Sequence, residues 1–421
     1  MTTAQAVSFA GSYQSKWPEM VRNGAIVCTV LSTPFIFVLN LAARETALSV
    51  SDLSVVLACV LLAGDLFAGR LRFPFGALCL LSLATIILSL VVNTEHVLVS
   101  KGPLGAAAEI PKNLIVWLHF YVLANLVRTR HQFLLVLKSW LIAAVIDALL
   151  GIGGSLAYQF AGIESSFSMM FRAQGTLADA NLFAAHLVVS FLLAVLYCRL
   201  TGKYHLWFIP VSLIFAAGIF FSASRGSTMT FGICLVLLCL VNCSWPVRLA
   251  ALACLGVLGL LISLAPIEGT GTSNPFFSRL STTTVSLDDE GAADRKRLWD
   301  SAWQEFAESP IFGVGRGNFR PLDEPDITKT GQIHNTYLGL LCEIGVLGFL
   351  VLITFLVCYP LRLARWPARI PALRIPTRIL LLSFLAVGLC GLTICIENYR
   401  GLWVLIATAE AYDRLYLRAI V

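Results

Sequence analysis

Arginine residues beside long apolar runs are the first candidates for chemistry in this sequence of 421 residues. Arg225 lies in SASRGS between two apolar runs, and Arg295 shares a predicted helix face with Trp299 and Phe306. A charge inside or at the edge of apolar sequence is costly and usually marks function. Contact with lipid headgroups is the alternative for Arg225, and a snorkelling side chain is the alternative for Arg295. Because guanidinium binds phosphate in a bidentate way, several such arginines predict an anionic ligand such as a polyprenyl diphosphate-linked sugar.

His334 is the one histidine of six that lies in a dense polar motif where a polar segment enters an apolar run. Imidazole titrates near neutral pH and can take a proton from an attacking hydroxyl group. A structural role at the start of a helix is the alternative. Arg172 is a weaker candidate for the same anion, and we expect Asn335 and Tyr337, beside His334, to contact the diphosphate or the glycan.

Acidic residues within apolar runs have a simpler interpretation. Glu343 lies nine residues beyond His334 and therefore on the opposite face of a helix. We expect a buried hydrogen bond there rather than catalysis. Asp52, Asp65 and Asp147 are interpreted in the same way, although each could line a polar cavity.

The polar segment before His334 holds further charges with weaker claims. Arg297, Arg316 and Arg320 are predicted to be solvated loop charges. The run Asp288-Asp289-Glu290 could hold a divalent ion, but no further ligands are spaced around it, so a solvated loop is favoured. We expect neither a metal ion nor a cofactor.

The composition decides the class of protein. Hydrophobic residues make up 58% of the chain and charged residues 13%, and the mean hydropathy is +0.82. Soluble proteins carry about a quarter charged residues, and single soluble cores stop growing at roughly 250–300 residues. A soluble enzyme, a secreted disulfide scaffold and a disordered chain are excluded. The sequence predicts an all-α, polytopic membrane protein, and its net charge of +6 is no signal for nucleic acid.

About twelve apolar runs are long enough to suggest spans, since a spanning helix needs roughly 20 residues. With the N-terminus inside, most Lys and Arg residues between the runs fall on the inner side, as the positive-inside rule requires. Both termini are then cytoplasmic, and residues 266–333 form one outer loop between the ninth and tenth spans of a single membrane domain, 1–421. The expected spans are 25–43, 49–68, 74–93, 113–127, 133–153, 181–198, 206–222, 227–242, 247–265, 335–358, 377–396 and 400–413.

The outer loop contains one amphipathic helix, predicted over 294–309. Arg295, Trp299, Ala302 and Phe306 follow the spacing of one face. We expect this face to lie on the membrane surface or on the helix bundle. Pro310 ends the helix, and the glycines that follow make a pliable turn.

An ordered set of motifs resembles the O-antigen ligase/polymerase superfamily. The set consists of SRG at 224–226, R-x-x-x-W at 295–299, PIFGVGRGNF at 310–319 and HN-x-x-L at 334–338. The twelve expected spans and the large late outer loop agree with the resemblance, which is closest to the O-antigen ligases of the superfamily.

The resemblance implies a GT-C-type membrane glycosyltransferase in the bacterial inner membrane, with its active site facing the periplasm. The donor would be an undecaprenyl diphosphate-linked glycan, the acceptor would be the lipid A–core oligosaccharide, and membrane lipids would surround the protein. His334 would be the base for the acceptor hydroxyl. Arg225 and Arg295 would hold the diphosphate, with Arg172 as a helper, and direct displacement would invert the anomeric carbon.

Two other functions stay open at this stage. An O-antigen or exopolysaccharide polymerase would use similar residues but a lipid-linked glycan as acceptor, and a pilin-type protein glycosylase is a lesser variant. A transporter or flippase is the alternative from another class. Transporters tend to show internal repeats and charged sites near the midplane of the bilayer, and neither feature is evident in this sequence.

Overall fold

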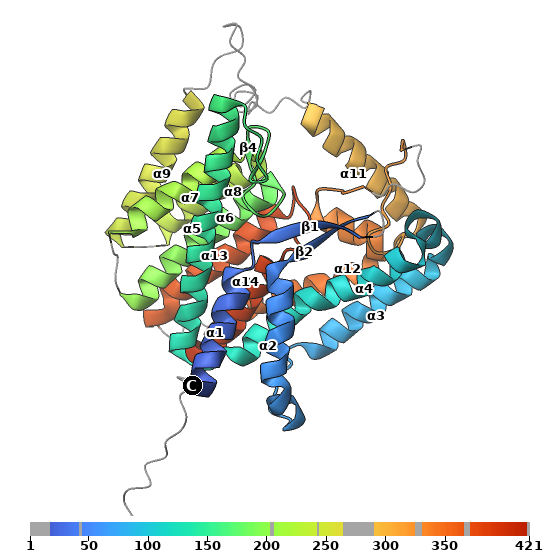
Figure 1. Cartoon of the computed structure of the whole chain (residues 1–421), viewed down its shortest axis with the longest axis horizontal. Helices are drawn as coiled ribbons and strands as arrows, with labels where there is room; N and C mark the ends of the chain where they lie inside the picture. The colour runs from blue at the N-terminus through green and yellow to red at the C-terminus, as the bar shows by residue number, and fades with distance from the viewer. Residues whose placement is uncertain are drawn as a thin grey trace, which may run out of the picture.

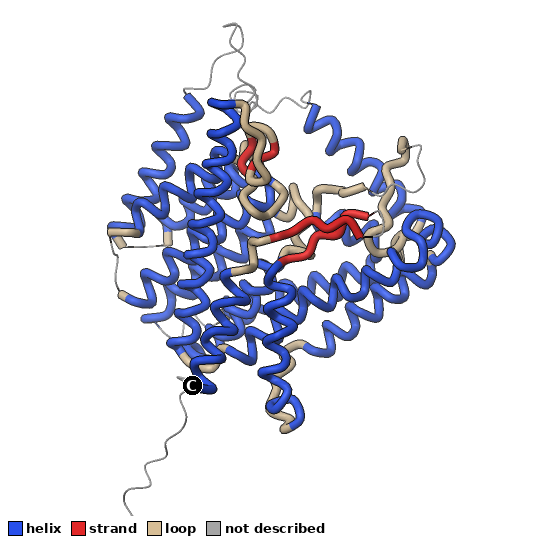
Figure 2. The backbone as a smooth tube through the Cα atoms, viewed as in Figure 1, coloured by secondary structure: helices blue, strands red, loops and turns tan. Residues whose placement is uncertain are grey.

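The structure of the protein, a computed structural model, describes residues 17–41, 44–202, 206–241, 244–263, 290–324, 331–365 and 371–418. These residues are mostly helical (Figure 1, Figure 2). The helices are α1 (Trp17–Leu31), α2 (Val50–Phe67), α3 (Gly76–Val92), α4 (Thr94–Leu126), α5 (Arg130–Ala161), α6 (Ala180–Thr201), α7 (Phe208–Phe221), α8 (Arg225–Leu240), α9 (Trp245–Ser263), α11 (Glu290–Glu308), α12 (Thr336–Ala364), α13 (Arg374–Cys390) and α14 (Arg400–Tyr412). Short turns η1 (Pro371–Leu373) and η2 (Asp413–Leu417) precede α13 and follow α14.

Several helices have the length and composition of membrane spans, which supports a polytopic membrane protein. Five described segments qualify: α2, α5, α6, α12 and the segment Pro371–Cys390. A sixth is possible if α3 and residues 94–100, which meet at an angle of 81°, form one broken span. Helices α7 and α8 and the described apolar part of α9 are shorter. The described helices therefore support five or six spans, and the expected twelve are not established.

The expected first span, 25–43, is wrong in its second half. Helix α1 ends at Leu31, and the chain then forms an antiparallel hairpin of β1 (Ile36–Leu41) and β2 (Arg44–Ser49). Pro34 has no N–H group and disfavours a helical conformation in the residue before it, so the helix cannot continue. The hairpin crosses from the helices around α6 towards α11 and α12 (Figure 2).

The structure differs from the sequence prediction in two further places, a second, shorter hairpin and an early end of α13. Strands β3 (Ser168–Met169) and β4 (Arg172–Ala173) pair beyond the end of α5. Helix α13 ends at Cys390, so the last residues of the expected span 377–396 are turns.

Helix α6 lies at the centre of the bundle. In its apolar window 83% of the residues are buried, more than in any other described candidate span. It packs against α5, α7, α8 and α13. Phe183 and Phe191 are completely buried, which suits the close packing of protein interiors.

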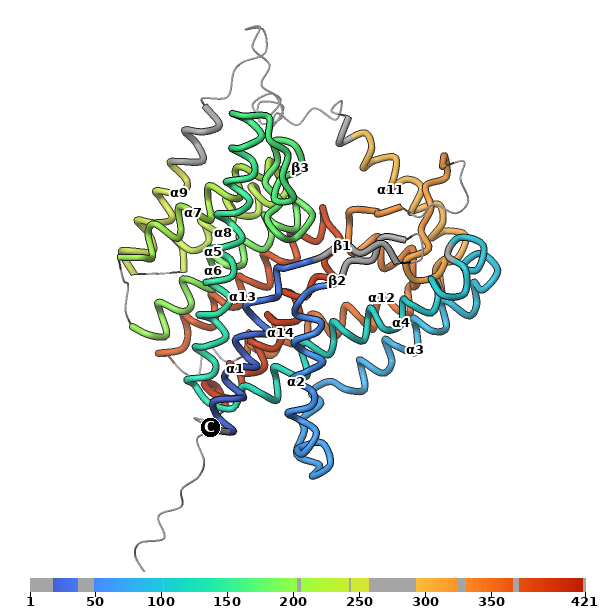
Figure 3. Tube along the Cα trace, in the orientation of Figure 1, coloured from blue at the N-terminus to red at the C-terminus, as the bar shows by residue number. Residues whose placement is uncertain are grey.

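The start of α1 and the end of η2 lie at the same end of the molecule (Figure 3). Gln132 Nε2 donates to Asn23 Oδ1 at 3.1 Å, and Arg130 Nε donates to the carbonyl oxygen of Leu415 at 3.4 Å. We call this end of the bundle the terminal end. Helix α5 starts here, and its other end contacts β3 and β4. The segments with the motifs of the predicted site therefore lie at the opposite end, which we call the site end.

Candidate functional site

Three helix N-termini meet at the site end: those of α6, α8 and α12. Ser227 Oγ on α8 donates to the carbonyl oxygen of Asn181 on α6 at 3.4 Å. The N–H group of Thr336 on α12 donates to the carbonyl oxygen of Gly391 at 2.8 Å. A Cβ atom on Gly226 would lie 2.5 Å from Thr393 Oγ1, so the start of α8 closely approaches the same turn. Helix N-termini carry partial positive charge, so this arrangement favours an anion.

Side chains cap two of these helices. Asp179 Oδ1 accepts from the N–H groups of Asn181 and Leu182 at the start of α6, at 2.8 and 2.7 Å. Asn335 Oδ1 accepts from the N–H groups of Tyr337 and Leu338 at the start of α12, at 3.0 and 3.1 Å. The residue before α8, Ser224, makes no such capping bond. The Ser224 side chain therefore does not occupy the N–H groups of the first turn of α8.

Arg172 holds the turn that precedes Arg225. Its guanidinium is buried, with Nε donating to the carbonyl oxygen of Ser222 at 2.9 Å and a terminal nitrogen donating to Asn181 Oδ1 at 3.0 Å. These bonds join β4, the start of α6 and the end of α7. Ser222 lies three residues before Arg225, so Arg172 fixes the place from which Arg225 extends.

Arg225 is the first residue of α8 and is half-buried. The turn before it is tight, because Ala223 has a φ of +51°, a conformation that non-glycine residues adopt rarely. Such strained residues gather at functional sites, where surrounding contacts hold them in place. The sharp reversal between α7 and α8 places Arg225 at the site end.

His334 stands directly before the cap of α12 and is half-buried. It also has a left-handed backbone, with a φ of +52°. Burial lowers the pKa of His334 below its ordinary value; the carboxylate of Asp179 opposes this shift and the positive charge of Arg295 adds to it. The charges of Asp179 and Arg295 therefore act on His334, although the three residues lie in different segments. A neutral imidazole at neutral pH is the form that accepts a proton.

Helix α11 contacts Ile333, the residue directly before His334, through its apolar face. Trp299 Nε1 donates to the carbonyl oxygen of Ile333 at 3.0 Å. Ala302 is completely buried in a small apolar cluster with Ile333, and Trp299 packs against this cluster. Arg295, one turn before Trp299, lies on the same face. The structure confirms the predicted helix and shows that this face lies on the bundle.

Asn335 and Tyr337 both bond to backbone groups. The oxygen of Asn335 caps α12, as described above, and the hydroxyl group of Tyr337 donates to the carbonyl oxygen of Gly388 on α13 at 2.7 Å. These bonds fix the start of α12 against α13. They favour positioning of His334 over the direct substrate contact that we expected.

The interpretation of Arg316 as a solvated loop charge is wrong. Its side chain is 3% exposed and pairs with Glu343 at 2.6 Å and with Glu397 at 3.2 Å. The segment 310–317 enters a break in α12 at Gly345, which has a φ of +66° and a ψ of −176°. There the N–H group of Val346 donates to the carbonyl oxygen of Pro310 at 2.8 Å. We call Arg316, Glu343 and Glu397 the buried triad.

Arg297 and Arg320 have more exposed positions. Arg297 is 51% exposed and pairs with Asp294 and Asp323. Arg320 is half-buried near Glu305. The interpretation as a solvated charge is confirmed for Arg297.

The acidic residues of the apolar runs have the predicted structural bonds. Glu343 belongs to the buried triad. Asp52 accepts from Arg400 with both oxygens, at 3.1 and 2.8 Å. Asp147 accepts from the N–H and hydroxyl groups of Thr176, at 2.6 and 2.7 Å. Asp65 pairs with two arginines discussed below.

No group of three or more potential metal ligands occurs among the described residues. Asp288 and Asp289 of the acidic run lie outside the described residues. Among the described residues of this region, arginines and helix N-termini provide positive charge.

Two residues of this region were missed by sequence reasoning. Asp179 caps α6 and acts on His334, and an aspartate directly before an apolar helical run is a recognisable capping signal. Glu397 belongs to the buried triad, but it lies in a short turn whose sequence gives no sign of Arg316 as its partner. Only the fold brings these two residues together.

Comparison with known families gives a match over the part of the chain that contains several of these residues. Residues 210–353 match the family model described as O-antigen ligase, and this match supports the O-antigen ligase/polymerase superfamily for the chain. The matched range contains Arg225, Arg295 and His334. A search of curated proteins found no match.

Proposed function

We propose that the protein is an O-antigen ligase, a GT-C-type glycosyltransferase of the bacterial inner membrane. It transfers a glycan from undecaprenyl diphosphate to the lipid A–core oligosaccharide at the periplasmic face. The observation that carries the proposal is the position of His334 at the start of α12, close to the N-termini of α6 and α8, with the charges of Asp179 and Arg295 acting on it. The family match supports the same reaction class.

In the proposed reaction His334 accepts the proton of the acceptor hydroxyl group. The hydroxyl oxygen forms a bond to the anomeric carbon of the glycan while the bond from that carbon to the diphosphate oxygen breaks. The leaving diphosphate takes the electron pair and the configuration inverts. Arg225, Arg295 and the N–H groups of α8 stabilise the developing charge, as preorganised donors do in electrostatic catalysis. Fixed cations supply this charge without a metal ion.

The neighbouring residues have positioning roles in this proposal. Arg172 fixes the turn that carries Arg225 through its bond to Ser222. Asn335 and Tyr337 fix the start of α12 and therefore His334. The carboxylate of Asp179 favours the protonated imidazole that forms during the reaction, because it raises the proton affinity of His334.

The second candidate is a polymerase of the same superfamily, whose acceptor is a lipid-linked repeat. The same family match favours it equally. Supplying the purified protein with donor and either core lipid A or lipid-linked repeat distinguishes the two reactions. Glycan on core lipid A supports the ligase, and glycan on the repeat supports the polymerase.

The site is tested by Arg225→Ala, Arg295→Ala and His334→Ala, compared at matched membrane expression. Removal of one charged donor costs on the order of 10²–10³ in rate. Arg225→Ala is expected to weaken both transfer and donor-lipid affinity, whereas His334→Ala is expected to abolish transfer and keep donor affinity. Lysine rescues the arginine variants poorly, because it lacks the bidentate fork.

Arg297→Ala is the matched control, since Arg297 lies on the same helix as Arg295 but is exposed. We expect wild-type transfer from this variant. Near-normal transfer by both Arg225→Ala and Arg295→Ala would reject the diphosphate site. Wild-type transfer by His334→Ala would reject the base, and Glu305 on α11 would be tested next, because burial raises its pKa to about 7.

A further inference from the structure

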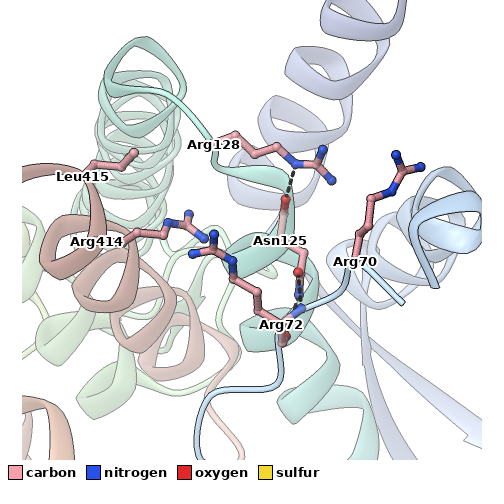
Figure 4. Close-up of a pocket in the computed structure, with 6 residues that line it drawn as sticks. All are labelled: Arg70, Arg72, Asn125, Arg128, Arg414 and Leu415. Atoms are coloured by element: carbon pink, nitrogen blue, oxygen red, sulfur yellow. Dashed lines mark hydrogen bonds between the residues drawn. The ribbon is translucent and has the colours of Figure 1, made fainter. Parts of the chain in front are cut away.

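A basic pocket of about 380 Å³ opens at the terminal end of the bundle, away from the proposed active site (Figure 4). It is formed by three segments that are far apart in sequence: the turn between α2 and α3, the turn between α4 and α5, and η2. Four arginines provide most of the lining. The lining residues are Arg70, Arg72, Asn125, Arg128, Arg414 and Leu415.

The pocket has a preorganised backbone. The side chain of Asn125 accepts from the N–H group of Arg72 at 2.8 Å and donates to its carbonyl oxygen at 2.9 Å. Arg128 Nε donates to the carbonyl oxygen of Asn125 at 3.1 Å. A terminal nitrogen of Arg414 donates to the carbonyl oxygen of Ala124 at 3.0 Å. These bonds hold three of the arginines around one point before any ligand binds.

The positive charge of the pocket exceeds its negative charge. Asp65 pairs with Arg70 at 3.2 Å and also with Arg128. Arg72 and Arg414 have no carboxylate within ion-pair distance among the described residues. Burial lowers the pKa of Arg414, and the charge of Arg72 lowers it further. Like charges therefore crowd the pocket, and an anion would relieve their repulsion.

Exposed apolar side chains adjoin the pocket. Phe73, which directly follows Arg72, is 55% exposed, and Leu66 and Phe67 at the end of α2 are 53% and 89% exposed. A free phosphate ion has no apolar part that could contact these side chains, whereas a phospholipid carries acyl chains beside its headgroup. Arginine binds phosphate oxygens in a bidentate way, and basic pockets at the ends of spanning helices suit anionic headgroups.

We propose that this pocket binds the phosphate headgroup of an anionic glycerophospholipid. The lipid lies in the leaflet at the terminal end of the bundle, with its chains against Phe67 and Phe73. The headgroup bridges Arg72, Arg128 and Arg414, and so connects the turn after α2, the turn after α4 and η2. The proposal needs only that the helices span a membrane, and it holds for a ligase, a polymerase or a transporter.

The test is native mass spectrometry of the full chain in detergent, titrated with dioleoylphosphatidylglycerol, dioleoylphosphatidylcholine and inorganic phosphate. Wild-type protein is expected to retain phosphatidylglycerol in preference to phosphatidylcholine. Arg72→Gln should weaken phosphatidylglycerol binding by roughly fivefold, the effect of one basic residue at an anionic membrane surface. Arg72 is suitable because it is exposed and its side chain makes no bond within the described structure.

Arg365→Gln is the matched control, because Arg365 is also exposed, lies directly after α12 and does not line the pocket. We expect wild-type lipid binding from it. If Arg72→Gln folds poorly, Arg72→Lys replaces it as the pocket variant, since lysine keeps the charge but lacks the bidentate fork and should also weaken phosphatidylglycerol binding. Equal lipid affinity in wild type and the pocket variant would overturn the proposal. Displacement of phosphatidylglycerol by millimolar phosphate would also overturn it, by identifying a free phosphate as the occupant.

Discussion

Replacement of Arg316 by methionine is expected to destabilise the protein strongly. The side chain is 3% exposed and bonds to Glu343 at 2.6 Å and to Glu397 at 3.2 Å, whose side chains are 14% and 10% exposed. Methionine fills much of the volume but leaves two carboxylates facing each other without a cation. Breaking a buried ion pair on one side costs about 3–5 kcal/mol. With an unfolding entropy of about 2.1 cal/mol/K per residue, this lowers the midpoint temperature by roughly 3–6 °C.

The assay is thermal unfolding of the detergent-solubilised protein, followed by fluorescence-detected size-exclusion chromatography. Glu343→Gln provides the comparison, because Arg316 then keeps one ion pair, with Glu397. The amide oxygen of the new glutamine can still accept a hydrogen bond from Arg316. We expect the midpoint of Glu343→Gln to fall by less than half the decrease in Arg316→Met. Arg297→Ala, at an exposed pair, should leave the midpoint unchanged. Equal midpoints for wild type and Arg316→Met would refute the buried triad.

Three further results are expected. Because the pKa of His334 is lowered, its imidazole stays neutral at a pH where an ordinary histidine is protonated, so transfer is lost only in more acidic solution. Asp179→Asn removes the carboxylate that raises this pKa, and the acidic limb of the pH–rate profile should therefore move to still lower pH. Gly345→Ala should destabilise the protein by more than about 2 kcal/mol in the same unfolding assay, because the new Cβ atom would lie 2.2 Å from the carbonyl oxygen of Ile311. Gly153→Ala is the control and should leave the stability unchanged, because its Cβ atom meets no atom within 4 Å. Transfer by the purified protein should continue in excess EDTA, and loss of activity that Mg²⁺ or Mn²⁺ restores would contradict the proposed neutralisation by arginine.

Local sequence signals predicted much of the helical structure. The amphipathic spacing around Trp299 located α11, and Pro310 ended it where expected. Aspartate and asparagine before apolar runs mark the starts of α6 and α12. Such signals act within one or two turns, so they can be identified without knowledge of the fold. The same reasoning is wrong at β1 and β2, because it predicts that the apolar residues after Pro34 continue a span, whereas they form a hairpin.

The candidate site was predicted only in part, because residue type and context show which side chain is unusual but not what it contacts. Arg225 and His334 were unusual charges beside apolar runs, and both lie at the site end. Arg172 had the same appearance, yet its bonds to Ser222 and Asn181 give it a positioning role. The left-handed backbone of His334 is likewise invisible in a list of residues.

The sequence by itself predicted a helical, polytopic membrane protein, because 58% hydrophobic residues with 13% charged residues are more apolar than a soluble core can use, and the described helices support this class. It also determined which arginines and histidine stand beside helix ends. Only the tertiary structure decided that Arg316 is buried against Glu343 and Glu397, and that Arg72 and Arg414 share one pocket. The physical reason is that helical periodicity defines an apolar face but not its partner. Contacts between residues tens or hundreds of positions apart depend on how all the helices pack together.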